Sequence, residues 1–241
     1  MTTATLPPAA SPPPSALPKL AALMNNVDPG QRLLITGVHY RDFVRLAEWR
    51  DEMCRWSARL AYDHGKLEIM VVTNPHERFR KIVALLIEVW IEETGGDYLP
   101  SGQLTHSRED LDSGFEPDEC YYIQNWKKVA GIRQIDFTKD PPPDLCVEAE
   151  VSRTLLARLP IYATFKIPEV WRYNGERLIV LVLRPDGSYQ ESSVSRALPT
   201  LPLAELPRFL ALAEDLSISF AAISRRFREW IRTLPPMAPK S

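Results

Sequence analysis

Cysteine is scarce in this sequence, and its few cysteines form no metal-binding or disulfide pattern. Cys54, Cys120 and Cys146 are far apart along the chain, and no two of them make a CxxC pair. An odd number of scattered cysteines argues against a disulfide framework, and the missing pair argues against the common zinc sites. We expect each cysteine to be a small apolar filler of a strand or helix.

Long apolar runs are also absent. No stretch approaches the roughly 18 uninterrupted apolar residues that suggest a membrane-spanning helix, and the first residues lack the basic and then apolar pattern of a secretory signal. We therefore expect a cytoplasmic protein with no membrane partner. A chain of 241 residues can bury one sizeable core, so a single domain with tails is the expectation.

An excess of positive charge is missing as well. The chain has 29 Lys and Arg against 31 Asp and Glu, a formal net charge of -2. A protein of this charge does not coat nucleic acid by bulk electrostatic attraction, so any such contact must be local. Local basic clusters are more often solvated helix faces than phosphate contacts. The clusters to consider are Arg78, Arg80 and Lys81, then Lys127 and Lys128, then Arg225, Arg226 and Arg228.

Proline is abundant at both ends and divides the chain. Residues 1–20 are rich in proline and poor in large apolar side chains, so burial cannot offset the entropy of ordering and we predict a disordered tail. Residues 234–241 have the same character and form a second loose tail. Between the tails we place the main domain at 35–195 and a helical segment at 200–233.

The spacing of apolar residues predicts an α+β order of elements. Helical spacing predicts helices over 40–52, 75–94, 152–166 and 203–234, the last of them broken around Asp215 to Ser219. Short apolar runs bounded by turn residues predict a hairpin over 59–73, short strands between 97 and 150, and a three-stranded meander over 169–194. The result is a single domain in which helices flank a central mixed β-sheet, and a doubly wound nucleotide-binding fold is disfavoured.

Three acidic residues, Asp118, Glu148 and Glu150, stand on predicted strands, where a carboxylate is costly to keep. Residues i and i+2 of a strand point to the same face, so Glu148 and Glu150 project together. Two carboxylates about 6.6 Å apart repel by roughly 2.5 kcal/mol at an effective dielectric of about 20. A divalent metal or an arginine would compensate them, and the spacing alone does not decide between the two.

Magnesium prefers oxygen ligands and commonly takes one or two carboxylates, with water and phosphate as the other ligands. Asp118 and Glu148 could supply these two carboxylate ligands. A metal held there would activate a water for attack on a phosphodiester and would neutralise charge on the transferred group. The alternative is an ordinary sheet face on which Arg158 and Arg172 balance Glu148 and Glu150.

Several short segments follow one another between about Tyr40 and Glu191. They read YDHGKLEIM, NPHERFRKIVALL, GFEPDECYY, PPDLCVEAEVS, ARLPIY and KIPEVWRY. Together and in this order they resemble the Uma-type family of restriction endonucleases. Because the resemblance rests on linked motifs, it is far more specific than any one of them.

The resemblance implies a restriction endonuclease-like α+β fold with a PD-(D/E)XK active site. Asp118, which follows Pro117, matches the first acid of that pattern, and Glu148 matches the second. The usual lysine two residues further on is replaced here by Glu150. Related members bring the cation from the following helix, four residues before a tyrosine, and this position holds Arg158. Arginine keeps the charge, but it cannot transfer a proton because its pKa is too high.

The leading hypothesis is a metal-dependent endonuclease that hydrolyses DNA phosphodiester bonds with Mg²⁺ or Mn²⁺. Asp118 and Glu148 would be the metal ligands, Glu150 a third ligand or water-orienting base, and Arg158 the charge stabiliser. The alternative is a weakened or inactive nuclease fold that acts as a nucleic-acid or protein interaction module, which the missing lysine favours.

Two further residues belong to the candidate set. His76, in a block that resembles the family, either binds phosphate or metal or caps its helix and faces solvent. Glu68, on the predicted hairpin, either reaches the same site or is an exposed strand acid. A homodimer would suit the cutting of both strands of a duplex, although no residue indicates one.

Overall fold

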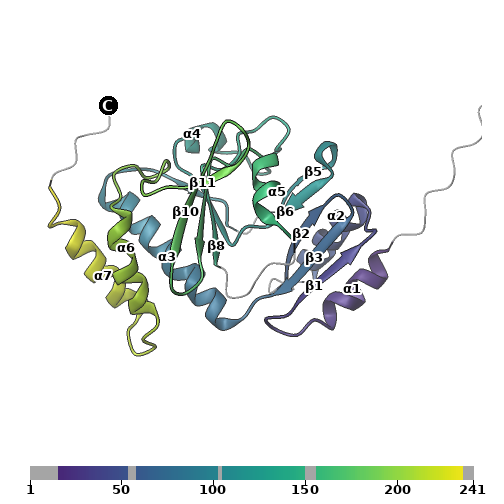
Figure 1. The fold of residues 1–241 in the computed structure, drawn as a ribbon, viewed down its shortest axis with the longest axis horizontal. Helices are drawn as coiled ribbons and strands as arrows, with labels where there is room; N and C mark the ends of the chain where they lie inside the picture. The colour runs from purple at the N-terminus through teal and green to yellow at the C-terminus, as the bar shows by residue number, and fades with distance from the viewer. Residues whose placement is uncertain (1–15, 54–57, 103–104, 150–155, 236–241) are drawn as a thin grey trace, which may run out of the picture.

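The computed structural model describes residues 16–53, 58–102, 105–149 and 156–235. Within these ranges the strands form two sheets rather than one, and helices pack around both (Figure 1). The α+β fold expected from the sequence is confirmed, whereas the single central sheet is divided in two. Glu150 and Cys54 lie outside the described residues.

The five-stranded sheet is antiparallel throughout. In spatial order its strands are β1 (Arg32–Thr36), β3 (Lys66–Val71), β2 (Ala58–Asp63), β6 (Ser113–Phe115) and β5 (His106–Arg108). The predicted hairpin over 59–73 is confirmed as β2 and β3. Its turn is formed by His64 and Gly65, both with positive φ, where glycine has no steric penalty.

The six-stranded sheet is mixed, because β8 and β9 pair in parallel while the other pairs are antiparallel. Its last three strands are the predicted meander. In spatial order the strands are β11 (Tyr189–Glu191), β10 (Leu178–Leu183), β9 (Glu169–Tyr173), β8 (Leu145–Ala149), β7 (Glu119–Tyr122) and β4 (Leu99–Pro100).

The structure has helices at the predicted ranges 40–52, 75–94, 152–166 and 203–234, the last of them in several pieces, and two short helices, Leu17–Asn25 and Trp126–Val129, where none was predicted. Within the described ranges none of the helices is both long and apolar enough to cross a membrane. They are α1 (Leu17–Asn25), α2 (Tyr40–Glu52), α3 (Asn74–Glu93), α4 (Trp126–Val129), α5 (Arg158–Thr164), α6 (Leu206–Leu210) and α7 (Phe220–Ile231), with 3₁₀ turns η1 (Glu109–Leu111), η2 (Leu203–Glu205) and η3 (Ala211–Ala213).

The N-terminal helix corrects one prediction. Residues 17–20 were expected to be part of a disordered tail, but α1 begins at Leu17. Its proline occupies the first turn, where a missing N–H costs nothing. Leu20 and Met24 are buried in the core that α1 and α2 form over the five-stranded sheet, so burial offsets the entropy of ordering.

The six-stranded sheet has a helix on each face. Val147 and Trp171 point towards α3, and α6 and α7 belong to the same core, so the C-terminal helical segment is not a separate unit. Cys146 and Val170 point the other way and pack against α5. Because side chains alternate along a strand, Glu148 shares the face of Cys146 and points towards α5. Cys146 is free and buried, as expected of an apolar filler. Cys120, which lies opposite it on β7, is also free and buried.

Glu169, at the start of β9, is a fully buried carboxylate with a structural role. It accepts hydrogen bonds from the indole N–H of Trp171, from Ser195 Oγ at 2.6 Å and from the backbone N–H of Ala197 at 2.9 Å. The backbone N–H of Arg196 donates to it as well. These bonds attach the segment after β11 to the six-stranded sheet.

Replacing Glu169 with alanine removes the acceptor of these buried donors. We expect Glu169→Ala to lower the free energy of unfolding by about 3 kcal/mol, because buried donors without acceptors keep their full desolvation cost. Urea unfolding followed by circular dichroism measures this. The control is Glu191→Ala on β11, where the side chain is 53% exposed and the change should stay within about 0.5 kcal/mol. Equal effects of the two substitutions would contradict the assignment.

Candidate active site

The candidate site lies where the chain passes from one sheet to the other. Residues 116–118 connect β6 of the five-stranded sheet to β7 of the six-stranded sheet. Glu68 comes to this junction from β3, Glu148 from β8 and Arg158 from the start of α5. Glu68, Asp118, Glu148 and Arg158 are all between 0% and 7% exposed. The site is therefore a cluster of buried charges, which must be paired to be tolerated.

Arg158 contacts an acid from each sheet. Its Nη2 lies 3.2 Å from Glu68 Oε1, and its Nη1 lies 3.3 Å from Glu148 Oε1. The same Nη1 donates to the backbone carbonyl of Glu116 at 3.2 Å. Burial lowers the pKa of Arg158, but Glu148 and Glu68 outweigh burial and hold the pKa above its ordinary value. The guanidinium is thus permanently charged and joins the two sheets.

Both acids have further partners. Glu68 accepts hydrogen bonds from Arg32 Nη1 at 2.9 Å and from the backbone N–H of Leu156 at 3.0 Å. Glu148 accepts a hydrogen bond from the Tyr162 hydroxyl. Arg158 and Tyr162, four residues apart, therefore meet on the same carboxylate.

Asp118 belongs to a second cluster next to the first. Its Oδ2 accepts from the backbone N–H of Ala149 at 2.7 Å and lies 3.2 Å from His76 Nε2. Burial raises the pKa of Asp118, but the hydrogen bond and charge of His76, with Ala149 and Arg59, outweigh burial and hold the pKa below its usual range. These contacts therefore favour the ionised form of Asp118. His76 is buried against it and does not face solvent.

Arg59 on β2 is part of the site and was not anticipated. Its Nε lies 4.0 Å from Asp118 Oδ1, and its Nη2 lies 3.6 Å from Glu77 Oε1. The side chain is 3% exposed. Arg59 is a charged residue in the apolar strand run RLAY, and a charged residue on a predicted strand is the signal by which Asp118 and Glu148 were found. The same signal could have identified Arg59.

Asp118 and Glu148 satisfy the donor chemistry of magnesium, which needs only one or two protein carboxylates. The backbone N–H of Asp118 donates to the Val147 carbonyl at 3.2 Å, so the two acids stand on directly adjacent backbone segments. Among the described residues, no three His, Cys, Asp or Glu side chains converge on one point. A metal would therefore be held by two carboxylates, in competition with His76 and Arg158.

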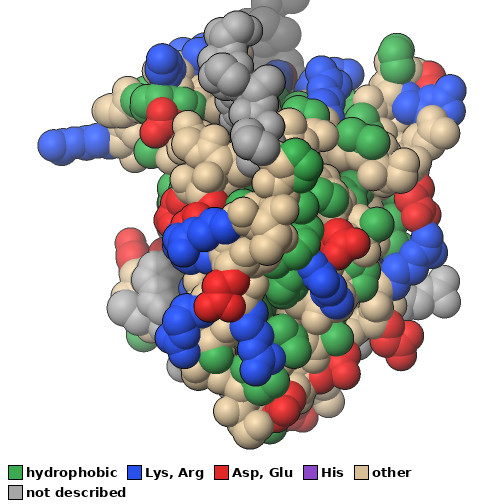
Figure 2. All heavy atoms as spheres, turned by 90° about the vertical axis from the view of Figure 1, so that its left-hand side faces the viewer, with side chains coloured by type: hydrophobic (Ala, Val, Ile, Leu, Met, Phe, Trp, Pro, Cys, Tyr) green, Lys and Arg blue, Asp and Glu red, His purple; other side chains and the backbone are tan. Residues whose placement is uncertain are grey.

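Two arginines of the basic clusters seen in the sequence are paired with acids. Arg228 pairs with Glu92 at 2.7 Å and with Glu93 at 2.6 Å, and Arg80 pairs with Glu119. Figure 2 faces the side where α6 and α7 lie, and it shows basic and acidic side chains interspersed there rather than one broad basic patch. Among the described residues, this face therefore does not present a single block of positive charge.

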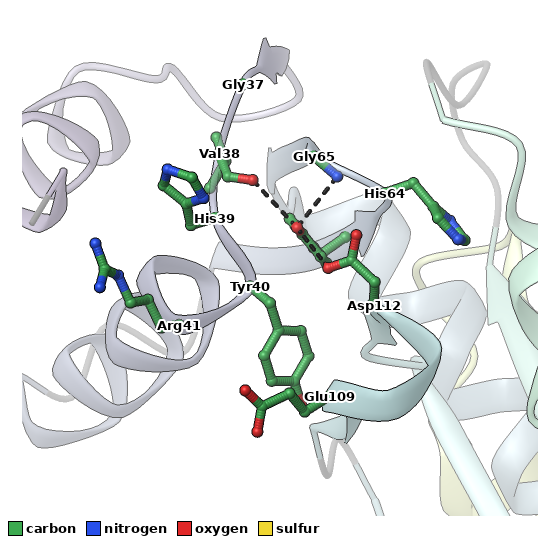
Figure 3. A pocket seen from close by; sticks show the side chains of 10 residues that line it. Gly37, Val38, His39, Tyr40, Arg41, His64, Gly65, Glu109 and Asp112 are labelled. Carbon is green, nitrogen blue, oxygen red and sulfur yellow. Dashed lines mark hydrogen bonds between the residues drawn. The ribbon is translucent and has the colours of Figure 1, made fainter. Parts of the chain in front are cut away.

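A hollow of about 690 Å³ lies away from Asp118 and Glu148, between the start of α2, the β2–β3 turn and η1 (Figure 3). The Tyr62 hydroxyl joins its walls by donating to Asp112 Oδ1 at 2.9 Å and accepting from the Gly65 N–H at 3.1 Å. None of the candidate site residues lines it. Size alone does not make it the catalytic site.

The lowered pKa of Asp118 makes a prediction about acid stability. The folded pKa lies below the ordinary value of 3.8, so the ionised group contributes stability that is fully present above that value. This stability is lost as the pH falls through the folded pKa. Urea unfolding between about pH 2 and pH 6 should therefore show a shallower acid loss in Asp118→Asn than in the wild type. Identical slopes would show that Asp118 titrates normally.

Comparison with known protein families identifies the family of the chain. The family model Uma2, described as "putative restriction endonuclease", matches residues 48–216, which is more than half of the chain. All candidate site residues named above fall inside this range, except Arg32 on β1. A search of curated proteins found no match.

Proposed function

Because the chain belongs to the Uma2 family, whose description is "putative restriction endonuclease", we propose that it hydrolyses phosphodiester bonds of DNA with Mg²⁺ or Mn²⁺. One observation carries the proposal. Asp118 and Glu148, two buried carboxylates, stand on adjacent backbone segments, and the buried cation Arg158 contacts the second of them.

Asp118 and Glu148 would hold the metal. When bound, it would lower the pKa of a water and neutralise charge on the phosphate. The two protein groups contribute differently. Asp118 is kept ionised by His76 and Arg59. Glu148 is oriented by the Tyr162 hydroxyl and by Arg158.

Arg158 would stabilise negative charge on the phosphate. A guanidinium pairs with phosphate through two parallel hydrogen bonds, which a lysine cannot do. Its pKa is held above the ordinary value, because Glu148 and Glu68 outweigh the lowering effect of burial, so it does not transfer protons. Glu150 stays our predicted third ligand or water-orienting base.

Nicking of supercoiled plasmid by the purified chain tests the proposal. We expect metal-dependent nicking that Asp118→Ala and Glu148→Ala each reduce by about 100-fold or more, because each removes a metal ligand. Mg²⁺ or Mn²⁺ should also raise the melting temperature of the wild type and not of Asp118→Ala.

Glu176→Ala, an exposed acid on the β9–β10 turn, is the matched control and should leave nicking unchanged. A wild type without nicking at any Mg²⁺ or Mn²⁺ concentration, and without a metal-linked rise in melting temperature, would overturn the proposal.

A second candidate is a nuclease fold that binds nucleic acid or protein without cutting. It is favoured by the ion pairs of the site, since Arg158 contacts Glu68 and Glu148, and His76 contacts Asp118, so these carboxylates already have cationic partners or donors. Glu150 in place of the usual lysine points the same way. DNA binding that persists without metal-dependent nicking would support this candidate.

A further inference from the structure

A small pocket lies beside Glu148, between α5 and β9. Its volume is about 260 Å³, and its lining includes Glu148, Arg158, Tyr162 and Arg172 over an apolar part formed in part by Val170. At about 30 Å³ for each water, this is room for about nine waters, less than the roughly 300 to 1,000 Å³ of pockets for whole small molecules. The space suits a phosphate group with a few waters rather than a nucleotide.

The fold places Arg172 at this pocket by strand register. β8 and β9 are parallel, and Glu148 pairs with Arg172. Trp171 and Tyr173 are buried in the core on the α3 side. Since side chains alternate along a strand, Arg172 lies on the opposite face, where Glu148 and α5 are. A cation therefore stands on the strand next to the candidate metal ligand.

The donors of the pocket suit the oxygens of an anion. Arg158, Arg172 and the Tyr162 hydroxyl line it together with the carboxylate of Glu148. Arg158 is more than nine-tenths buried, and its Nε has no hydrogen-bond partner among the described residues. A buried donor without an acceptor is uncommon, and the oxygen of a bound anion would supply one.

We propose that this pocket holds a backbone phosphate of the nucleic acid, next to the phosphate that is cleaved, and that Arg172 is the residue that grips it. The inference rests on the proposed function, because the phosphate that is cleaved would lie at the metal held by Asp118 and Glu148, and the pocket lies beside Glu148. Arginine suits this task through its paired donors. A phosphate contact positions the substrate and carries no sequence information.

Binding of two duplexes of unrelated sequence to the full chain tests the proposal. Fluorescence anisotropy is measured over a series of salt concentrations, with Ca²⁺ in place of Mg²⁺ so that binding is separated from cleavage. We expect Arg172→Ala to weaken binding about tenfold on both duplexes and to reduce the slope of log K against log salt by about 1, as the loss of one phosphate contact requires. Arg172→Lys should keep the slope.

Arg184→Ala is the matched control, because this arginine follows β10 in the same sheet and is 52% exposed. It should change neither affinity nor slope. If Arg172→Ala melts below the assay temperature, Arg172→Gln removes the charge while keeping most of the volume, and the same loss of slope is expected.

The outcomes separate the two proposals. Unchanged affinity and slope in Arg172→Ala, while Asp118→Ala abolishes nicking, would overturn the assignment of Arg172 and leave the proposed function standing. A wild type that neither binds nor nicks DNA would overturn both. A loss restricted to one of the two duplexes would also contradict a phosphate contact.

Discussion

The buried ion pairs of Arg158 connect the two sheets of the described structure at their junction. Its guanidinium contacts Glu68 on one sheet and Glu148 on the other, at 3.2 Å and 3.3 Å. Each buried charge has a desolvation cost of several kcal/mol that only good pairing offsets. Loss of this arginine would leave two buried carboxylates without their shared partner. The junction of the two sheets and the candidate site are therefore the same feature of the molecule.

This arrangement explains how the site can be assembled before a metal binds. His76 and Arg59 keep Asp118 ionised although it is buried, and Tyr162 and Arg158 orient Glu148. In the proposed function Arg158 would share Glu148 with a bound metal. The guanidinium of Arg158 could then pair with a phosphate of the substrate, and Arg172 adds a second cation on the same face.

Local signals in the sequence were enough for most of the elements, though not for α1 and α4, and for part of the site. The hairpin of β2 and β3 follows from its alternating run and polar turn, and Arg158 and Tyr162 meet on Glu148 because helical spacing puts them on one face. The contact of Arg158 with Glu68 joins residues 90 positions apart, which no local pattern encodes. The division into two sheets and the burial of Leu20 under α2 depend on tertiary packing for the same reason.

A crystal structure with Mn²⁺ tests the central claim most directly. The account predicts one anomalous peak in contact with carboxylate oxygens of Asp118 and Glu148, with the guanidinium of Arg158 moved away from Glu148. It also predicts that the peak disappears in Asp118→Ala crystals. A fully occupied peak elsewhere, or no peak while Arg158 keeps both of its ion pairs, would contradict the assignment of these two acids as metal ligands.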